Sequence, residues 1–217
     1  MSEGPSRTTA AGSESADGDS PTAADSSADP RATSGTRAIS DTVLNVGAGE
    51  QGDGNVTLDL LSAVGPDVQG TATTLPFADE TFDVVEMDQV LEHIAPERLG
   101  DVFEECYRVL RADGRLEAWV PHAASRLYDQ DPTHRSRWTH GTPEYFADGN
   151  FSWYYDNRAF AFDLVDREVT VWVLEDAPLS GVRSVLLQTA HRLLEWDDGV
   201  VYRPSVSGSI HFTLRKV

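Results

Sequence analysis

Between residues 42 and 121 the apolar positions fall into short runs that polar and turn-forming residues separate. Runs at 42–46 (TVLNV), 55–60 (NVTLDL) and 82–87 (FDVVEM) have the length and the branched side chains of buried strands. A fourth run, at 115–120 (RLEAWV), closes on Pro121. The pattern predicts four strands of one sheet.

The segment between the third and fourth strands has the period of a helix. Its apolar stripe consists of Leu99, Val102, Phe103, Cys106, Val109 and Leu110. Pro96 suits the first turn of this helix, and Asp113-Gly114 suits its end. Strand, helix and strand in this order predict a right-handed crossover, and therefore an α/β fold with a mostly parallel twisted sheet and flanking helices.

The two ends of the chain differ in their content of apolar residues. Runs at 167–174 and 209–217 predict strands on either side of a helix over about 179–196, the last strand being antiparallel to the sheet. Residues 1–40 are small, polar and acidic, so ordering them would cost more entropy than it returns. We expect a disordered tail there, with an arm that folds on a partner as the alternative, and one domain over 41–217.

The charge balance narrows the range of partners. The chain of 217 residues has a formal net charge of −19 and a pI near 4.5. A positive surface is needed to bind nucleic acid or an anionic membrane, so neither partner is expected. Lys216 is the only lysine. This acidic, lysine-poor composition resembles that of proteins from extreme halophiles, whose carboxylates keep them hydrated in molar salt.

The location of the protein is predicted from three further features. Cys106 is the only cysteine, so an intrachain disulfide is impossible, and its place on the apolar stripe favours a buried thiol over a nucleophile. No apolar stretch approaches the roughly 20 residues that span a bilayer. The first residues lack the basic-then-apolar pattern of a secretory signal. These features predict a cytoplasmic protein of undetermined oligomeric state.

A glycine-rich loop follows the first predicted strand. Gly47, Gly49 and Gly52 spell G-x-G-x-x-G, a signature of dinucleotide-binding folds. In those folds the loop opens a helix that holds the pyrophosphate, and an acidic residue follows about 20 positions later. Here Asp59 follows Gly47 by only 12 positions, which leaves no room for that helix. A dehydrogenase is therefore a remote alternative.

Asp59 closes the second predicted strand and has two interpretations. A carboxylate at a strand end can accept hydrogen bonds from both ribose hydroxyls of an adenosine group without any phosphate-binding helix. It can equally cap a turn. The strand end alone does not decide between these roles.

Five pieces, in this order, resemble the class I S-adenosylmethionine-dependent methyltransferases, in the group with a short glycine loop and an L-P-F…F-D…L-E-H signature. These pieces are NVGAGE (45–50), Asp59, LPFADETFDVV (75–85), VLEHI (90–94) and RVLRADGRL (108–116). Each piece is a weak signal by itself, and the set together is specific. The resemblance implies a Rossmann-like fold and S-adenosylmethionine as the cofactor.

The resemblance also implies a role for individual residues. Gly47, Ala48, Gly49 and Glu50 would pack against the methionine part of the cofactor, and Asp59 would hold the ribose. The adenine edge and the sulfonium would be lined by Thr71, Ala72, Leu75, Asp88 and Gln89. Thr71 departs from the family pattern, which commonly has an acidic residue there, and the threonine hydroxyl would have to make the contact with adenine.

The segment 121–158 follows a strand end and is expected to form the loop or lid over the methyl acceptor. We predict that Asp131, His134 and His122 line the acceptor pocket, with His134 as a base that a carboxylate orients. The alternative is an Asx-turn at Asp131 with histidines that stabilise the loop. Arg135 and Arg137 could hold an anionic acceptor, although surface arginines are usually less specific.

Other polar and aromatic groups of this region favour structural roles. Glu92 and His93 are expected to brace a turn. A metal site of His122, Asp131, His134 and His140 has spacing that matches no familiar ligand pattern, so no metal is predicted. The aromatic run FSWYYDN (151–157) could cap the pocket or belong to the core.

The sequence thus predicts a methyltransferase that acts on a small-molecule acceptor. The alternative is a catalytically silent domain that binds S-adenosylmethionine, its demethylated product or a partner. Neither the acceptor nor the methylated atom follows from the sequence.

Overall fold

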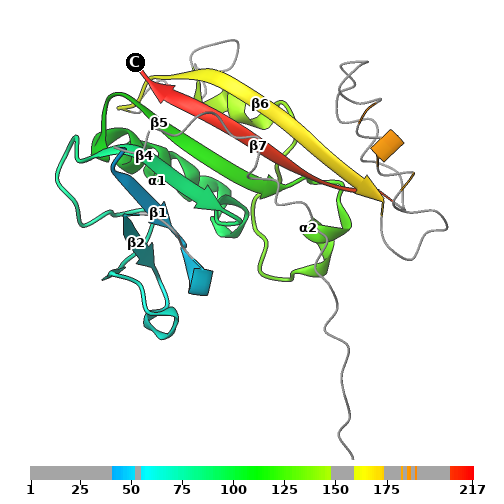
Figure 1. The fold of residues 1–217 in the computed structure, drawn as a ribbon, viewed down its shortest axis with the longest axis horizontal. Coiled ribbons are helices and arrows are strands. Elements are labelled where there is room, and N and C mark those ends of the chain that lie inside the picture. The colour runs from blue at the N-terminus through cyan, green and yellow to red at the C-terminus, as the bar shows by residue number, and fades with distance from the viewer. Residues whose placement is uncertain are drawn as a thin grey trace, which may run out of the picture. The chain divides into compact units, whose positions relative to one another are not determined.

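One seven-stranded sheet organises the chain in the computed structural model (Figure 1). Residues 41–51, 55–147, 159–173 and 206–217 are described, together with Val182, Val185, Leu186 and Thr189, which are helical. The predictions for residues 1–40, for the aromatic run 151–157 and for most of the helix 179–196 lie outside these residues. In the described segments, no helix is both long and apolar enough to cross a membrane.

The order of the strands confirms the predicted fold class. The strands are β1 (Val43–Val46), β2 (Val56–Asp59), β3 (Val68–Gln69), β4 (Phe82–Asp88), β5 (Leu110–Pro121), β6 (Phe162–Val173) and β7 (Val206–Lys216). They lie in the order β3-β2-β1-β4-β5-β7-β6. The strands β1 to β5 are parallel, and β7 runs antiparallel to both β5 and β6.

The helices and 3-10 turns are short apart from α1. They are η2 (Gly49–Gln51), η3 (Ser62–Val64), η4 (Leu91–His93), α1 (Pro96–Val109), α2 (Arg126–Gln130) and η5 (Thr142–Phe146). The predicted stripe of α1 is confirmed, because its members Leu99, Val102, Phe103, Cys106 and Val109 are all buried. Figure 1 shows α1 against one face of the sheet.

The predicted end of α1 at Asp113-Gly114 is wrong. The helix ends at Val109, because Leu110 is already extended and pairs with Phe82 of β4. The chain then bulges before Arg115 pairs with Val84, and Asp113 adopts a left-handed φ of 61° within this excursion. Asp113-Gly114 is therefore a turn signal inside β5.

The last two strands are longer than predicted. β6 begins at Phe162, where the apolar pattern suggested 167, and β7 begins at Val206, where it suggested 209. The extra residues of each strand pair with the predicted part of the other, Phe162 with Lys216 and Val206 with Val173. Pairing between these two strands therefore extends each of them beyond the apolar run that predicts it.

Aromatic side chains join α1 to the segment after β5. Phe103 of α1 stacks on Phe146 of η5 with ring centroids 3.9 Å apart. Trp138 is fully buried and stacks on both Phe146 and Phe212 of β7. This cluster holds the segment 122–147 against the sheet.

Asp83 ties the start of β4 to the start of β1. One oxygen, Oδ2, accepts hydrogen bonds from the Thr42 hydroxyl (2.6 Å), the Thr42 backbone N–H (2.8 Å) and Arg111 (2.7 Å). These bonds, led by the Thr42 hydroxyl, lower the pKa of Asp83 to about 2. The ionised carboxylate therefore stabilises the fold above the ordinary pKa of aspartate, and this contribution is lost as the pH falls towards 2.

We expect Asp83→Asn to lower the free energy of unfolding by about 1 kcal/mol near neutral pH, a value discounted because the side chain is a third exposed. The gap from wild type should close between about pH 4 and pH 2, as the wild-type carboxylate becomes protonated. Urea unfolding of both proteins across this range measures it. A gap independent of pH would contradict the assigned role.

Candidate functional site

The strand order reverses beside β1, which locates the candidate site. From β1 the chain runs outward to β2 and β3, then returns to the other side of β1 as β4. In open parallel sheets, ligands bind at such a reversal, beyond the carboxyl ends of the strands. The glycine loop follows β1 and Asp88 ends β4, so both lie at this point.

The glycine loop has the backbone that its residues require. Gly47 and Gly49 have φ angles of 71° and 57°, in the left-handed region that glycine tolerates best. A Cβ on Gly47 would lie 2.4 Å from Cγ2 of Val90, so the loop packs directly on the residue before η4. A Cβ on Gly49 would meet no described atom within 4 Å. The loop is thus pinned at Gly47 and open at Gly49, as a ligand-binding loop needs to be.

Asp59 joins the glycine loop to the end of β2. Its Oδ2 accepts the backbone N–H of Gly49 (3.0 Å), and its Oδ1 accepts that of Leu61 (2.8 Å). Each carboxylate oxygen has two lone pairs, so each retains one for a ligand hydroxyl. The carboxylate can therefore brace the loop and hold a ribose at once, and the two interpretations of Asp59 are compatible.

The segment expected along the adenine edge begins beside Asp59. The N–H of Gly70 donates to the Asp59 carbonyl (3.0 Å), which places Thr71 next to the end of β2. Thr71 is exposed, and its hydroxyl lies 3.1 Å from that of Thr73. Ala72 and Leu75 are buried and belong to the core.

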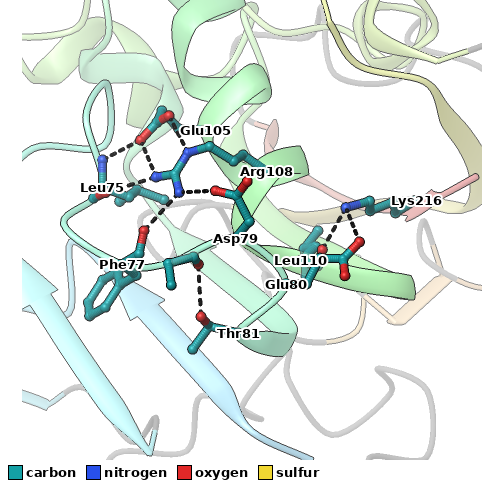
Figure 2. Close-up of polar contacts among 10 residues, drawn as sticks. Leu75, Phe77, Asp79, Glu80, Thr81, Glu105, Arg108, Leu110 and Lys216 are labelled. Carbon is teal, nitrogen blue, oxygen red and sulfur yellow. Dashed lines mark hydrogen bonds and ion pairs between the residues drawn. The ribbon is translucent and has the colours of Figure 1, made fainter.

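Two charged residues of α1 clamp the following L-P-F segment (Figure 2). Arg108 donates to the carbonyls of Leu75 (2.9 Å) and Phe77 (2.8 Å) and to the carboxylate of Asp79 (2.8 Å). Glu105 accepts two further bonds from Arg108 and one from the Leu75 N–H (2.6 Å). The L-P-F and R-V-L pieces of the sequence are thus two halves of one contact.

The end of β4 brings a strained residue to the site. Gln89 has a left-handed φ of 55°, and its N–H donates to the Trp119 carbonyl of β5 (2.9 Å). Such backbone conformations cost about 1–3 kcal/mol for residues other than glycine and cluster at ligand sites. Asp88 is exposed at the same strand end. That these two residues flank the sulfonium stays a prediction.

A fully buried carboxylate lies just beyond this strand end. Glu92 of η4 has no exposed surface, and neither carboxylate oxygen accepts a hydrogen bond within the described segments. Burial raises the pKa of Glu92 to about 8, and the negative charges of Asp88 and Asp131 also raise it. The backbone N–H of Glu92 itself lowers the pKa and offsets part of this effect. Sequence analysis gave this residue a bracing role only.

Two histidines share this corner with Glu92. His134 Nε2 lies 3.9 Å from Glu92 Oε1 and 3.9 Å from Asp131 Oδ2. His134 Nδ1 lies 2.8 Å from the Tyr128 carbonyl, which only accepts, so Nδ1 carries the proton and Nε2 the lone pair in the neutral ring. The group that orients His134 is therefore this carbonyl, where a carboxylate was expected. The ring of His93 packs edge-on against His134, with centroids 4.8 Å apart.

Backbone contacts hold the two segments of this corner together. The N–H groups of Arg135 and Ser136 both donate to the Glu92 carbonyl, at 2.7 and 3.0 Å. The Ser136 hydroxyl donates to the Leu91 carbonyl and accepts from the buried Trp138 indole. The segment after β5 is thereby fixed onto η4.

The remaining candidates take up structural positions. His122 is fully buried, and its Nδ1 accepts the Ala124 N–H (3.1 Å), so it stabilises the turn after β5. Asp131 accepts the hydroxyl and N–H of Thr133, which lower its pKa, and this is the Asx-turn considered as an alternative. Cys106 is buried, which raises the pKa of its thiol.

Comparisons with known proteins find a methyltransferase domain model and methyltransferase structures similar to this chain. Residues 38–118 match the family described as a methyltransferase domain. A candidate methyltransferase from Bacillus halodurans has a similar structure, with a TM-score of 0.51 and 19% identity over 81% of this chain and 92% of its own. An S-adenosylmethionine-dependent methyltransferase from Methanosarcina mazei also has a TM-score of 0.51, with 14% identity over 82% of this chain and 92% of its own. The comparison with curated proteins gives no match.

The matched residues 38–118 contain the glycine loop, Asp59, the L-P-F segment and the end of β4. Residues 38–118 thus match a methyltransferase domain, and the chain has a fold similar to that of solved methyltransferases, so S-adenosylmethionine is the cofactor that this combination implies.

Proposed function

We propose that the chain transfers a methyl group from S-adenosylmethionine to a small-molecule acceptor. The cofactor supplies an electrophilic methyl on a sulfonium. The methyl–sulfur bond breaks with its electron pair left on sulfur, a bond from the acceptor's nitrogen, oxygen or carbon forms, and the acceptor gives up a proton. Holding the reactants in line is worth on the order of 7–11 kcal/mol in well-oriented systems.

The contact between Asp59 and Gly49 carries this proposal. It places a carboxylate that can accept ribose hydroxyls against the open part of the glycine loop, at the reversal of the strand order. Asp88 and Gln89 close the other side of this position, since the neighbouring Val90 contacts Gly47. These residues, together with Ala48, Glu50, Thr71, Ala72 and Leu75, form the proposed cofactor site.

The corner of His134 and Asp131 would face the acceptor. His134 Nε2 has its lone pair available, because the Tyr128 carbonyl holds the proton on Nδ1. This nitrogen is the proposed acceptor of the proton, with Asp131 stabilising the resulting imidazolium from 3.9 Å. His122 supports the turn that leads into this segment.

The charge of the chain favours a small acceptor. A net charge of −19 disfavours the phosphates of RNA and DNA and the surface of anionic membranes, an effect that molar salt weakens. The proposal is therefore a metabolite-sized acceptor, and the single cysteine suits a reducing, cytoplasmic environment.

Turnover separates this proposal from a silent cofactor-binding domain. The full chain is incubated with methyl-labelled cofactor and a panel of hydroxyl, amine and carbon acids, and release of S-adenosylhomocysteine is measured. We expect release that depends on one acceptor class and falls at least about tenfold in Asp59→Asn, because a hydrogen bond to a charged group is worth about 1.5–3 kcal/mol. Binding of S-adenosylhomocysteine without turnover on any class would favour the silent domain.

The composition gives a prediction about salt. We propose that the protein is adapted to high salt, since its 36 acidic residues outnumber the 17 basic ones and repel each other in dilute buffer. Salt screens this repulsion, so the melting temperature should rise steeply between dilute buffer and molar KCl. Thermal unfolding across a KCl series measures this rise, and a flat response would contradict the adaptation.

A further inference from the structure

Three side chains at and near η4 bring potential metal-ligating atoms close together. Glu92, His93 and His134 each offer one ligand atom, and these atoms lie within 4.8 Å of one another. We infer that Glu92, His93 and His134 form a binding site for a divalent transition-metal cation. This site is distinct from the metal set of His122, Asp131, His134 and His140 that the sequence suggested and set aside.

The hydrogen bonds around the two histidines leave the correct nitrogens free. The Thr133 hydroxyl donates to Asp131 (2.6 Å), so it accepts the Nδ1 proton of His93 (3.0 Å), and the lone pair of His93 lies on Nε2. His134 Nδ1 donates to the Tyr128 carbonyl in the same way. Metal-ligating histidines commonly donate their second ring N–H to a carbonyl or a carboxylate-linked group, which fixes the ligating tautomer.

The environment of the Glu92 carboxylate also favours a cation at this position. It has no exposed surface, and neither of its oxygens has a hydrogen-bond partner within residues 41–51, 55–147, 159–173 and 206–217. A buried polar group without a partner is destabilising, and a buried carboxylate is ordinarily paired or coordinates a metal. The nearest cationic candidate is His134, whose Nε2 lies 3.9 Å from Oε1, too far for a hydrogen bond. A cation between these two atoms satisfies both.

The separation of Glu92 and His134 is close to what a cation requires, and the three ligand atoms, which lie within 4.8 Å of one another, would close in on the ion. Bonds of about 2.0–2.2 Å from a metal to nitrogen or oxygen put neighbouring ligand atoms roughly 3–3.5 Å apart. The 3.9 Å between Glu92 and His134 is a few tenths of an ångström wider than this range. The two N–H groups that Arg135 and Ser136 donate to the Glu92 carbonyl hold the halves of the site in place before any ion arrives.

The ligand set selects the class of ion. Two imidazole nitrogens and one carboxylate oxygen suit zinc, manganese, iron or cobalt, whereas magnesium and calcium prefer oxygen ligands alone. Three protein ligands leave at least one coordination position open, as in catalytic rather than structural sites. His93 is the most exposed of the three, so the open position is accessible from solvent.

The location of the cluster gives the cation a role, which rests on the proposed function. Val90, two residues before Glu92, packs on the glycine loop. An acceptor hydroxyl that fills the open position would have its pKa lowered by the cation, and its proton would pass to solvent. In the loaded protein His134 is then a ligand, and the cation replaces it in activating an oxygen acceptor.

Cobalt(II) is the probe for this site, because its visible absorption reports nitrogen and oxygen coordination without any assay of activity. The full chain is stripped with a chelator, exchanged into molar KCl and titrated with Co²⁺. We expect absorption that saturates at one equivalent in wild type. Glu92→Gln and His134→Asn should weaken binding at least about 100-fold, and Thr133→Val, which frees His93 to rotate, about 10–100-fold.

His140→Gln is the matched control, since it removes a histidine of the same segment from outside the cluster and should leave Co²⁺ binding unchanged. Thermal unfolding provides a second readout: Zn²⁺ should raise the melting temperature of wild type and leave that of Glu92→Gln unchanged. Absence of saturable binding in wild type would overturn the inference, as would binding that survives in both ligand variants or disappears in His140→Gln.

Binding of S-adenosylhomocysteine in the presence of chelator keeps the two proposals separate. If the product binds but Co²⁺ does not, the metal site alone fails. If Co²⁺ binds but the product does not, the proposed function fails and the metal site stands.

Discussion

Gly47→Ala should destabilise the protein by about 2–5 kcal/mol and weaken S-adenosylhomocysteine binding at least tenfold. Part of the loss is the left-handed φ of 71°, which costs a non-glycine residue about 1–2 kcal/mol. The rest is overpacking, because the new Cβ would lie 2.4 Å from Val90 Cγ2, and such insertions cost about 1–3 kcal/mol. The loop cannot simply move away, since the Gly47 N–H donates to the Leu58 carbonyl at 2.7 Å.

Gly65→Ala separates these two causes. Gly65 has nearly the same φ, 72°, but a Cβ there would meet no described atom within 4 Å. We expect it to lose about 1–2 kcal/mol and to bind the product normally. Adding Val90→Ala to Gly47→Ala should recover part of the binding. Urea unfolding and calorimetry on the set test this, and equal effects of the two glycine substitutions would show that the contact with Val90 is unimportant.

Arg108→Ala should lower the free energy of unfolding by about 2–4 kcal/mol. The substitution removes the donors that the Leu75 and Phe77 carbonyls use, and it leaves Glu105 without its cation (Figure 2). Each partly buried acceptor left unpaired costs about 1–3 kcal/mol, reduced here because some of the groups reach water. The segment at 71–75 would also loosen, so we expect weaker binding of the adenosine moiety.

Arg98→Ala is the control on the same helix. Arg98 pairs with Asp101 at an exposed position, and such pairs are worth about 0–1 kcal/mol. Arg108→Lys keeps the charge but loses the planar fork, so it should fall between Ala and wild type. A loss in Arg108→Ala no larger than in Arg98→Ala would contradict the clamp.

The parts of the fold with local signals were predictable. Buried runs gave β1 and β4, and the apolar period gave the buried face of α1. The predicted end of α1 is wrong, because Asp-Gly is a turn signal within a strand as well as at the end of a helix. Only the pairing of Leu110 with Phe82 shows that β5 has already begun before Asp113. The early starts of β6 and β7 likewise depend on their mutual pairing.

The candidate site also has a part that the sequence predicts and a part that it does not. The glycine loop and Asp59 are close in sequence, so their contact could be anticipated from spacing. The cluster of Glu92, His93 and His134 could not, because it depends on backbone N–H groups of Arg135 and Ser136 that bind the Glu92 carbonyl. Backbone contacts leave no mark in side-chain patterns. An acidic residue beside Leu91 within an apolar turn was the one available signal.

Calorimetric titration of the full chain with S-adenosylhomocysteine, in molar KCl, tests the central claim most directly. Wild type and Asp67→Ala should bind with similar affinity, because Asp67 also accepts a backbone N–H but does so at the start of β2, away from the glycine loop. Asp59→Ala should lose at least about tenfold in affinity. The absence of binding by folded wild type, or equal binding by Asp59→Ala, would contradict a cofactor site at the glycine loop.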